Sequence, residues 1–500
     1  MVANKTVHLI SLGCPKNRVD SEVMLGQLTA SGYTPVSDAA AADVIVVNTC
    51  GFIAAAKEES VDTILEMGAH RQDGRCSKLV VTGCLSQRYA PELAREMPEV
   101  DHFLGTGNFD TIAEVLGGRP AATLARRSGL QVLQPGALQS VTSRPVHPRL
   151  RGKNALVPFR HAAETIGNRQ IVIPDPDFTL DASTPRTATQ AAYSRYLKIS
   201  EGCSNTCAFC IIPKLRGPQR SRRIFDVVAE AEQLVMAGAT ELVLIAQDLC
   251  AYGRDLSPRE DLASLLHALA DIGERMGRPL WIRCLYAYPK GLTEAVIDAM
   301  ATRPQILPYL DMPLQHIADG LLRRMRRGCG GAATRALVQR LRRRLPQLTL
   351  RTTFITGLPG ETEADFAELC DFLAEIRFER VGAFAYSQEE DTPAGSMADQ
   401  VPAEVAEARR QTLMGMAADI SRAQQHALVG QTLSVLVEGV SSESELLLQG
   451  RHAGQAPEID GLTYITAGVA SPGDVVEVEV AEAGDFDVAG SIVGATALAG

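Results

Sequence analysis

The sequence predicts an α/β protein in three parts: an N-terminal parallel α/β domain, a partial (β/α)6 barrel and a small C-terminal β-barrel. Short apolar strands alternate with helical stretches over the first 115 residues, and the same alternation returns between residues 193 and 423. Such alternation favours a parallel sheet whose faces are covered by helices. Residues 430–500 instead hold short β-rich runs separated by turn residues, which is typical of a small β-barrel.

The N-terminal domain, expected over residues 5–117, has a cysteine at the end of each of three strand-like runs. These runs are TVHLISLGC, DVIVVNTCG and KLVVTGC, and they place Cys14, Cys50 and Cys84 about one βαβ unit apart. Parallel strands bring their carboxyl ends to one edge of a sheet, so we expect the three thiols to converge. Each cysteine alone is explained equally well as a buried structural residue, but three together suit an iron–sulfur cluster with one open iron.

Residues 118–190 differ in composition from the domains on either side. Pro, Arg, Ser and Thr are frequent there, and periodicity is weak. A stretch of this length and kind inside one compact domain would be unusual. We therefore predict a linker or irregular insertion here, followed by the partial barrel over residues 191–425 and the small β-barrel over residues 428–496.

The strongest single motif is SEGCSNTCAFCIIP, which follows the first strand of the predicted barrel. Cys203, Cys207 and Cys210 have three and then two residues between them. Three thiolates on one tight loop can hold three irons of a 4Fe–4S cubane, which leaves the fourth iron open to the amino and carboxylate groups of S-adenosylmethionine (SAM). The alternatives are a zinc knuckle and an ordinary loop, but zinc prefers four ligands and no fourth lies nearby in the sequence.

Weaker candidates for SAM contact follow other barrel strands, at the carboxyl ends where such barrels bind their ligands. Gln247 ends the run TELVLIAQ, and Gly357, Gly360 and Glu361 belong to GLPGET, between a strand and a helix. A tight turn with Glu361 at the start of the helix explains the second motif about as well. No side chain beyond the cluster ligands is predicted to act as a catalytic acid or base.

Charge is distributed unevenly along the 500 residues, whose net charge is −10. Residues 430–500 hold eleven acidic side chains and one basic one, Arg451. An acidic module repels phosphate backbones and attracts basic partners. Between Asp319 and Glu361, by contrast, ten arginines occur with no acidic residue among them. A solvated basic helix face is the ordinary interpretation, and contact of the arginines at 323–344 with ribosomal or transfer RNA is the sharper one.

Taken together, these motifs resemble the radical SAM methylthiotransferases. The segments GCPKN, NTCGFI, TGCL and EGCSNTCAFCIIPKLRGPQRSR, with GLPGET and a C-terminal β-barrel, carry the resemblance, which covers nearly the whole chain outside the linker. It implies an N-terminal cluster domain, a radical SAM barrel and a TRAM β-barrel. It also implies that the three strand-end cysteines hold an auxiliary 4Fe–4S cluster and that the three loop cysteines hold the radical SAM cluster.

The family has two main branches, which differ in substrate. One modifies an adenosine of transfer RNA, and the other modifies an aspartate of small-subunit ribosomal protein twelve. GCPKN, CGFI and YSQEEDTPA look like the ribosomal-protein branch, because the tRNA branch usually has glutamine and methionine in place of Pro15 and Lys16. The acidic tail independently favours a basic protein substrate over RNA.

The resemblance therefore implies a transferase that adds a methylthio group to the β-carbon of that aspartate. One SAM supplies a methyl group to sulfur at the auxiliary cluster, and a second SAM yields the radical that removes hydrogen from the β-carbon. The alternatives are a tRNA methylthiotransferase and a non-catalytic iron–sulfur electron carrier or sensor. Carriers usually complete all four iron sites, whereas the cysteine loop supplies three ligands.

We expect a soluble cytoplasmic protein, with no membrane partner, that depends on an external reductant. No uncharged apolar run reaches the length of a membrane helix, and the first residues lack the apolar segment of a signal peptide. The eleven cysteines are an odd number spread over a long chain. In a cytosolic protein this favours metal ligands and free thiols over a disulfide framework.

Overall fold

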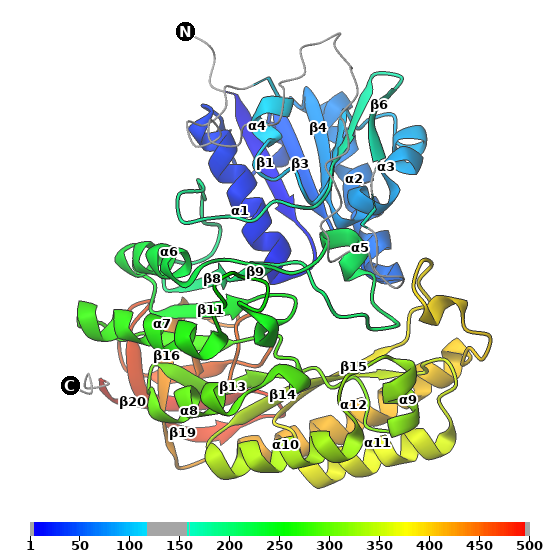
Figure 1. Cartoon of the computed structure of the whole chain (residues 1–500). Helices are drawn as coiled ribbons and strands as arrows, with labels where there is room; N and C mark the ends of the chain where they lie inside the picture. Colours follow the sequence, from blue (N-terminus) through cyan, green and yellow to red (C-terminus); the bar gives the residue numbers. More distant parts are fainter. Residues whose placement is uncertain (1–4, 118–157, 160, 496–500) are drawn as a thin grey trace. The chain divides into compact units, whose positions relative to one another are not determined.

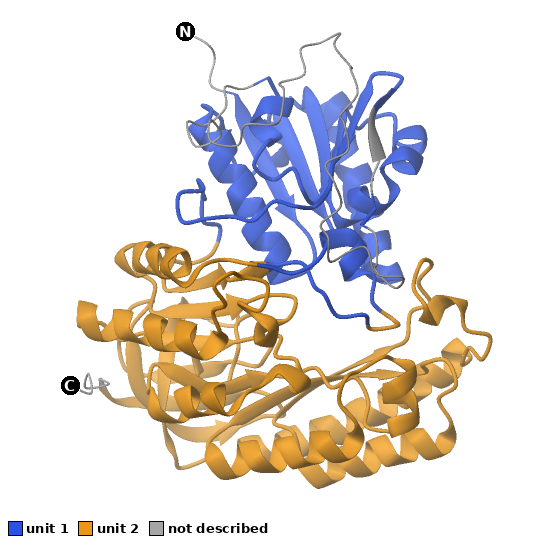
Figure 2. Cartoon of the chain, in the orientation of Figure 1, with its two compact units in different colours: residues 1–189, 201–206, 210–220 blue, residues 190–200, 207–209, 221–500 orange. Residues whose placement is uncertain are grey.

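The computed structural model describes residues 5–117, 158–159 and 161–495. The chain forms two compact units, drawn by element in Figure 1 and by unit in Figure 2. Unit 1 comprises residues 1–189, 201–206 and 210–220, and unit 2 comprises residues 190–200, 207–209 and 221–500.

Unit 1 is built on a seven-stranded sheet in the order β2-β1-β3-β4-β5-β7-β6, with every pairing parallel except that between β6 and β7. The strand VIVVNT is buried at all of its positions, as expected of a strand covered on both faces. Figure 1 shows α1 on one side of the strands and α2 and α3 on the other. The elements are β1 (Thr6–Ser11), α1 (Pro15–Ala30), β2 (Thr34–Pro35), β3 (Val44–Thr49), α2 (Ala54–Asp73), β4 (Lys78–Gly83), α3 (Cys84–Glu96), β5 (His102–Leu104), α4 (Ile112–Val115), β6 (His161–Ile166), β7 (Arg169–Ile173) and α5 (Ile212–Arg216).

The predicted linker is described only in part, because residues 118–157 and 160 lie outside the described residues. The rest of it is more regular than its composition suggests. β6 and β7 form an antiparallel hairpin, and β7 pairs in parallel with β5, so this stretch extends the N-terminal sheet. Residues 185–189 then contact α1, where Arg186 forms an ion pair of 2.7 Å with the fully buried Glu22.

Unit 2 contains an open parallel sheet of six strands in the order β15-β14-β13-β12-β11-β8, which confirms the partial (β/α)6 barrel. The helices α7, α8 and α11 each begin at a residue whose side chain caps the first turn. In α7, for example, the Asp261 side chain caps the first turn and Gly277 ends the helix in a left-handed conformation. The elements are β8 (Ser194–Lys198), α6 (Ile224–Met236), β11 (Glu241–Ile245), α7 (Leu262–Met276), β12 (Trp281–Cys284), α8 (Glu294–Thr302), β13 (Ile306–Asp311), α9 (Asp319–Arg324), α10 (Gly331–Arg344), β14 (Thr349–Thr356), α11 (Glu363–Ile376), β15 (Arg380–Ala385) and α12 (Ala403–His426).

A closed five-stranded barrel in the order β16-β17-β18-β20-β19 completes unit 2 and confirms the predicted C-terminal β-barrel. It belongs to the same compact unit as the six-stranded sheet. A buried ion pair joins the two parts, because Arg451 of the barrel contacts Glu241 of β11 at 2.6 Å. Within the barrel, Arg451 also contacts Glu438 at 2.7 Å. The strands are β16 (Thr432–Val440), β17 (Leu448–His452), β18 (Thr463–Ala467), β19 (Val475–Ala483) and β20 (Val488–Ala495).

Candidate functional site

The three strand-end cysteines lie just beyond the carboxyl ends of three neighbouring parallel strands in unit 1. The register pairs Asn48 of β3 with Ser11 of β1 and with Thr82 of β4. Cys50 and Cys84 each follow two residues after this row, and Cys14 follows three residues after it. Strand order and register thus bring the three predicted residues to one edge of the sheet.

The thiols at this edge lie close enough to influence one another. Burial, together with the neighbouring thiols of Cys84 and Cys14, raises the pKa of Cys50 to about 12. Burial also raises the pKa of Cys84, against the opposing effect of the Arg216 guanidinium. Gly13 closes the turn with φ +85°, and a Cβ added there would lie 2.9 Å from the Cβ and 3.1 Å from the Sγ of Cys50. A residue larger than glycine would therefore displace a candidate ligand.

Polar side chains outside the predicted ligand sets hold the cysteine-bearing turns in place. Asn17 Nδ2 donates hydrogen bonds to the Leu12 carbonyl at 2.8 Å and to the Thr49 carbonyl at 3.0 Å. Ser60 Oγ accepts from the Cys50 amide at 3.0 Å and donates to the Cys50 carbonyl at 2.9 Å. The asparagine of GCPKN was visible as a signal, whereas nothing local distinguishes Ser60 in the middle of α2.

The cysteine loop is divided between the units, with Cys203 and Cys210 in unit 1 and Cys207 in unit 2. In unit 1, the Cys203 amide donates to the Gly217 carbonyl at 3.0 Å. In unit 2, Arg327 Nη1 donates to the Cys207 thiol at 3.5 Å, and the same guanidinium lies 4.1 Å from the centre of the Tyr288 ring. Because the three cysteines are close in the sequence, the reach of the chain limits how far apart in space they can lie.

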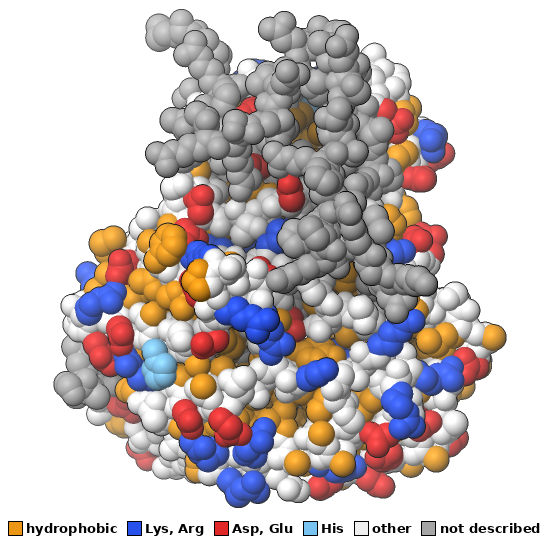
Figure 3. Space-filling view, viewed as in Figure 1, with side chains coloured by type: hydrophobic (Ala, Val, Ile, Leu, Met, Phe, Trp, Pro, Cys, Tyr) orange, Lys and Arg blue, Asp and Glu red, His pale blue; other side chains and the backbone are white. Residues whose placement is uncertain are grey.

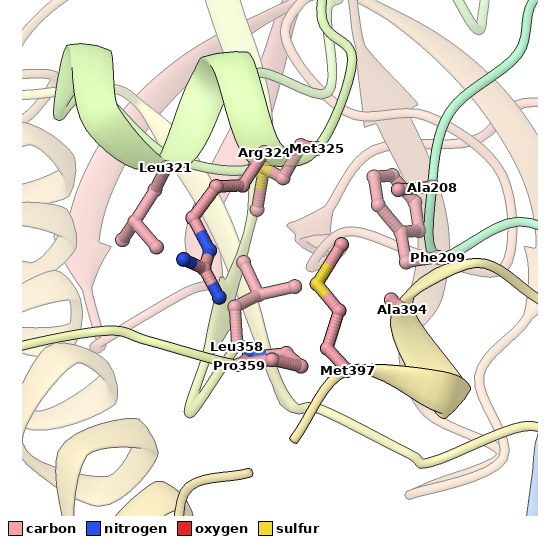
Figure 4. A pocket seen from close by; sticks show the side chains of 9 residues that line it. All are labelled: Ala208, Phe209, Leu321, Arg324, Met325, Leu358, Pro359, Ala394 and Met397. Atoms are coloured by element: carbon pink, nitrogen blue, oxygen red, sulfur yellow. The ribbon is translucent and has the colours of Figure 1, made fainter. Parts of the chain in front are cut away.

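A small apolar pocket of unit 2 begins at this loop (Figure 4). The Ala208 amide donates to the Met325 carbonyl at 2.9 Å, and the Ala394 amide donates to the Ala208 carbonyl at 2.9 Å, so backbone hydrogen bonds fix the loop to two other segments. Figure 4 shows two methionine side chains and an arginine side chain at this pocket. The lining residues are Ala208, Phe209, Leu321, Arg324, Met325, Leu358, Pro359, Ala394 and Met397.

The residues predicted to contact SAM have diverse surroundings. Glu361 is buried, and its carboxylate accepts from the amides of Gly357 and Leu358, so it closes the GLPGET turn. It also forms an ion pair of 3.3 Å with Arg409. A Cβ on Gly357 would overlap Ala406 of α12, which explains the glycine by packing. The middle of the turn, Leu358 with Pro359, lines the pocket instead.

The other predicted positions face different neighbours. A Cβ on Gly360 would lie 2.6 Å from a carboxylate oxygen of Asp399. Gln247 is half-buried just beyond β11. His316, which follows β13, is fully buried, and its Nδ1 accepts from the Ala318 amide at 3.1 Å. Burial lowers the pKa of His316 to about 4, which fits a neutral structural histidine.

No three His, Cys, Asp or Glu side chains within residues 5–117, 158–159 and 161–495 are grouped so as to hold a single metal ion. Zinc draws four ligands onto one centre, whereas each cysteine of a cubane binds a different iron. The donor set at both sites consists of thiols, which iron–sulfur clusters prefer.

The arginine-rich segment is less free than its sequence suggests, because carboxylates from other elements of unit 2 pair with it. In the view of Figure 3, basic and acidic side chains are intermixed over this unit. Arg323, Arg326 and Arg343 are exposed. Among the pairs are Arg324 with Asp399, Arg335 with Glu375, Arg340 with Glu294, Arg342 with Glu379 and Arg344 with Asp298.

Three family descriptions match the chain in order. Residues 6–105 match "Uncharacterized protein family UPF0004", residues 197–373 match "Radical SAM superfamily" and residues 429–493 match "TRAM domain". A protein named ribosomal protein uS12 methylthiotransferase RimO, from Anaeromyxobacter sp. (strain K), is 51% identical over 488 residues. The match covers 97% of this chain and 93% of that relative. The chain belongs to the RimO family of radical SAM methylthiotransferases.

Other RimO relatives are also similar to this chain over nearly their whole length. The one from Myxococcus xanthus (strain DK1622) is 49% identical, covering 98% of this chain and 92% of the relative. The one from Geobacter sulfurreducens is 45% identical, covering 98% and 99%. As a member of the RimO family, the chain is a transferase that uses SAM and iron–sulfur chemistry.

A solved structure supports the fold alone. The radical SAM methyltransferase TsrM from Kitasatospora setae, with cobalamin and a [4Fe-4S] cluster bound, matches with a TM-score of 0.53 at 14% identity. The match covers 78% of this chain and 77% of TsrM. Within the part of the chain that the structure describes, no helix combines the length and apolar character needed to cross a membrane.

Proposed function

We propose that this enzyme adds a methylthio group to the β-carbon of an aspartate in ribosomal protein uS12, using two molecules of SAM. One observation carries the proposal: relatives named for this activity match the chain at about 50% identity over nearly its whole length. Both sets of three cysteines fall within the matched regions. We further propose that the enzyme works in the cytoplasm, where ribosomal proteins are found, and takes electrons from an external reductant.

Two 4Fe–4S clusters follow from this proposal. Cys203, Cys207 and Cys210 would hold the radical SAM cluster, and the strand-end cysteines would hold the auxiliary cluster. The convergence of Cys14, Cys50 and Cys84 at one sheet edge supports the second set, as does the glycine turn that leaves room for the Cys50 thiol. In each set, three ligands leave one iron open to a small molecule.

The chain's own residues position and shield this chemistry. When bound, SAM and the clusters supply the organic radical and the methylthio group. Asn17 and Ser60 hold the turns of Cys14 and Cys50, and Arg327 directs an N–H group at the Cys207 sulfur. Hydrogen bonds of this kind fix the orientation of ligands and tune the group that they hold. No side chain is required as a conventional acid or base.

We place SAM contact at the carboxyl ends of the barrel strands. Gln247, Gly357, Gly360 and Glu361 remain the predicted neighbourhood, but their surroundings suggest different roles. Glu361 shapes the GLPGET turn through the amides of residues 357 and 358.

The charge of the C-terminal barrel supports a basic protein substrate over RNA. Arg451, its single basic residue, is 1% exposed and paired with Glu241 and Glu438. The barrel residues 430–495 therefore present no basic side chain to solvent. Such a surface repels a phosphate backbone and attracts a basic ribosomal protein. The exposed acidic residues are Glu443, Glu445, Glu458, Asp474, Glu479, Glu482 and Asp485.

Contact with ribosomal RNA is a narrower part of the proposal. Many arginines of the 323–344 segment already pair with carboxylates of the same unit. The contact would therefore fall to the exposed Arg323, Arg326 and Arg343. Each phosphate contact adds to the salt dependence of binding.

Incubation of the reconstituted enzyme with SAM, a reductant and either uS12 or transfer RNA tests the substrate. We expect mass spectrometry to find the methylthio group on one aspartate of uS12 and none on tRNA. Methylthiolated tRNA with unmodified uS12 would establish the competing substrate. Absence of 5′-deoxyadenosine under all conditions would instead favour a non-catalytic cluster protein.

A further inference from the structure

A buried arginine, Arg216, lies beside the strand-end cysteines and has no role in the proposed function. Arg216 ends α5 and is 2% exposed. Its guanidinium donates to Asp20 at 2.6 Å and to Glu201 at 3.3 Å, and it also donates to the Asn17 side chain. All four residues belong to unit 1. Burying a guanidinium is costly in free energy unless it is paired and hydrogen-bonded, and these partners compensate the buried charge of Arg216.

The partners of Arg216 include thiols as well as carboxylates. The guanidinium interacts electrostatically with Cys84, Cys14 and Cys50. Cys84 also packs in one buried cluster with Leu215, the residue that precedes Arg216 in α5. The Cys84 thiol and the carboxylates of Asp20 and Glu201 favour the charged form and raise the pKa of Arg216, although burial opposes it. A fixed positive charge is therefore present at the thiol edge at any physiological pH.

The anchors of Arg216 also belong to the cysteine-bearing turns. Asn17, whose amide holds the turn of Cys14, accepts from the guanidinium through its side-chain oxygen. Asp20 lies one turn further along α1, which begins immediately after Cys14. The orientation of the guanidinium is thus set by the same helix that positions a candidate ligand. A simple ion pair that stabilised only the fold would not need this connection to the thiols.

We propose that Arg216 is a positioning residue that balances the negative charge of the auxiliary cluster and raises its reduction potential. The inference rests on the proposed function, because it takes Cys14, Cys50 and Cys84 as ligands. Hydrogen bonds to the sulfurs and the net charge near a cluster are among the factors that set its potential. A buried cation at the Cys84 sulfur stabilises the more negative, reduced state and therefore makes the cluster easier to reduce.

The test is a redox titration of the full chain in a Cys203→Ala/Cys207→Ala/Cys210→Ala background, in which only the auxiliary cluster remains. Arg216→Met keeps much of the side-chain volume and removes the charge. We expect its midpoint potential, followed by electron paramagnetic resonance, to be lower by at least about 59 mV, a tenfold change in the one-electron equilibrium. Arg216→Lys keeps the charge and should recover most of the shift.

Arg222→Met is the matched control, because Arg222 is also buried and paired with two carboxylates, Asp226 and Glu230, but no cysteine contributes to its charge state. We expect it to leave the auxiliary potential unchanged. If Arg216→Met fails to fold, Asp20→Asn/Arg216→Met removes both members of the closest ion pair. We expect it to lower the potential by less than Arg216→Met would, because the lost carboxylate offsets part of the lost positive charge.

Two outcomes overturn the inference: an unchanged potential in the methionine variant, or a shift of equal size in Arg216→Lys. Failure of the ligand assignment is recognised separately. In that case the triple-alanine background binds no cubane at all, whatever residue occupies position 216.

Discussion

Cys203, Cys207 and Cys210 lie within eight consecutive residues, whereas Cys14, Cys50 and Cys84 come from the ends of three strands separated by whole helices. The first set is brought together by its covalent spacing. The second set is assembled only when β1, β3 and β4 pair in their register. The comparison teaches that two similar donor sets can depend on the fold to very different degrees. Damage to the N-terminal sheet should cost the strand-end site much more than the loop.

Removing one cysteine from each set should affect two different activities, the cleavage of SAM and the transfer of the methylthio group. We expect Cys207→Ala to abolish the cleavage of SAM, because the cluster that receives SAM loses a ligand. Cys50→Ala should instead release 5′-deoxyadenosine while forming no methylthiolated product. Chromatography of the nucleoside and mass spectrometry of uS12 measure the two activities. Loss of both activities in Cys50→Ala, in a variant that still folds, would contradict this division.

Gly13 offers a way to damage the strand-end set through the backbone alone. Gly13→Ala places a Cβ 2.9 Å from the Cβ of Cys50 at φ +85°, so we expect loss of auxiliary iron together with strain on the order of 1–2 kcal/mol. Gly32→Ala is the matched control, since Gly32 has φ +93° but no heavy atom within 4 Å of the added Cβ. It should lose similar stability and keep its iron. Equal iron contents in the two variants would show that strain alone matters.

Acid should weaken unit 2 through His316. Burial lowers the pKa of this histidine to about 4 from a usual value of 6.5. The histidine therefore takes up a proton near pH 6.5 in the unfolded chain but only near pH 4 in the folded chain. The free energy of unfolding is consequently highest above pH 6.5 and decreases as the pH falls. Between pH 6.5 and 5 the free energy of unfolding decreases by about 2 kcal/mol, at 1.36 kcal/mol per pH unit.

His316→Asn isolates this contribution, because the Asn oxygen can accept from the Ala318 amide and does not titrate. Urea unfolding at the two pH values should give a smaller pH dependence in the variant than in the natural chain. An identical dependence would mean that other groups carry the acid sensitivity.

Much of the candidate site could be predicted because its signals are local. Short stretches of sequence are enough to recognise the CX3CX2C loop, the cysteine at the end of each apolar strand and the β-rich acidic tail. The role of Glu361 was harder to predict, since a turn residue and a ligand contact look alike in GLPGET until its carboxylate is seen on the amides of residues 357 and 358.

The sequence by itself determined the three-part α/β architecture and the excess of acidic over basic residues in the tail, and it predicted the two sets of three cysteines as cluster ligands. Only the tertiary structure decided that part of the expected linker joins the N-terminal sheet, that Arg451 is buried between carboxylates and that Arg216 meets Asp20 across 196 residues of chain. The physical reason is the separation in sequence between the residues that interact. Periodicity and motif spacing record interactions between near neighbours in the sequence, whereas strand order and buried ion pairs depend on partners that no local window contains.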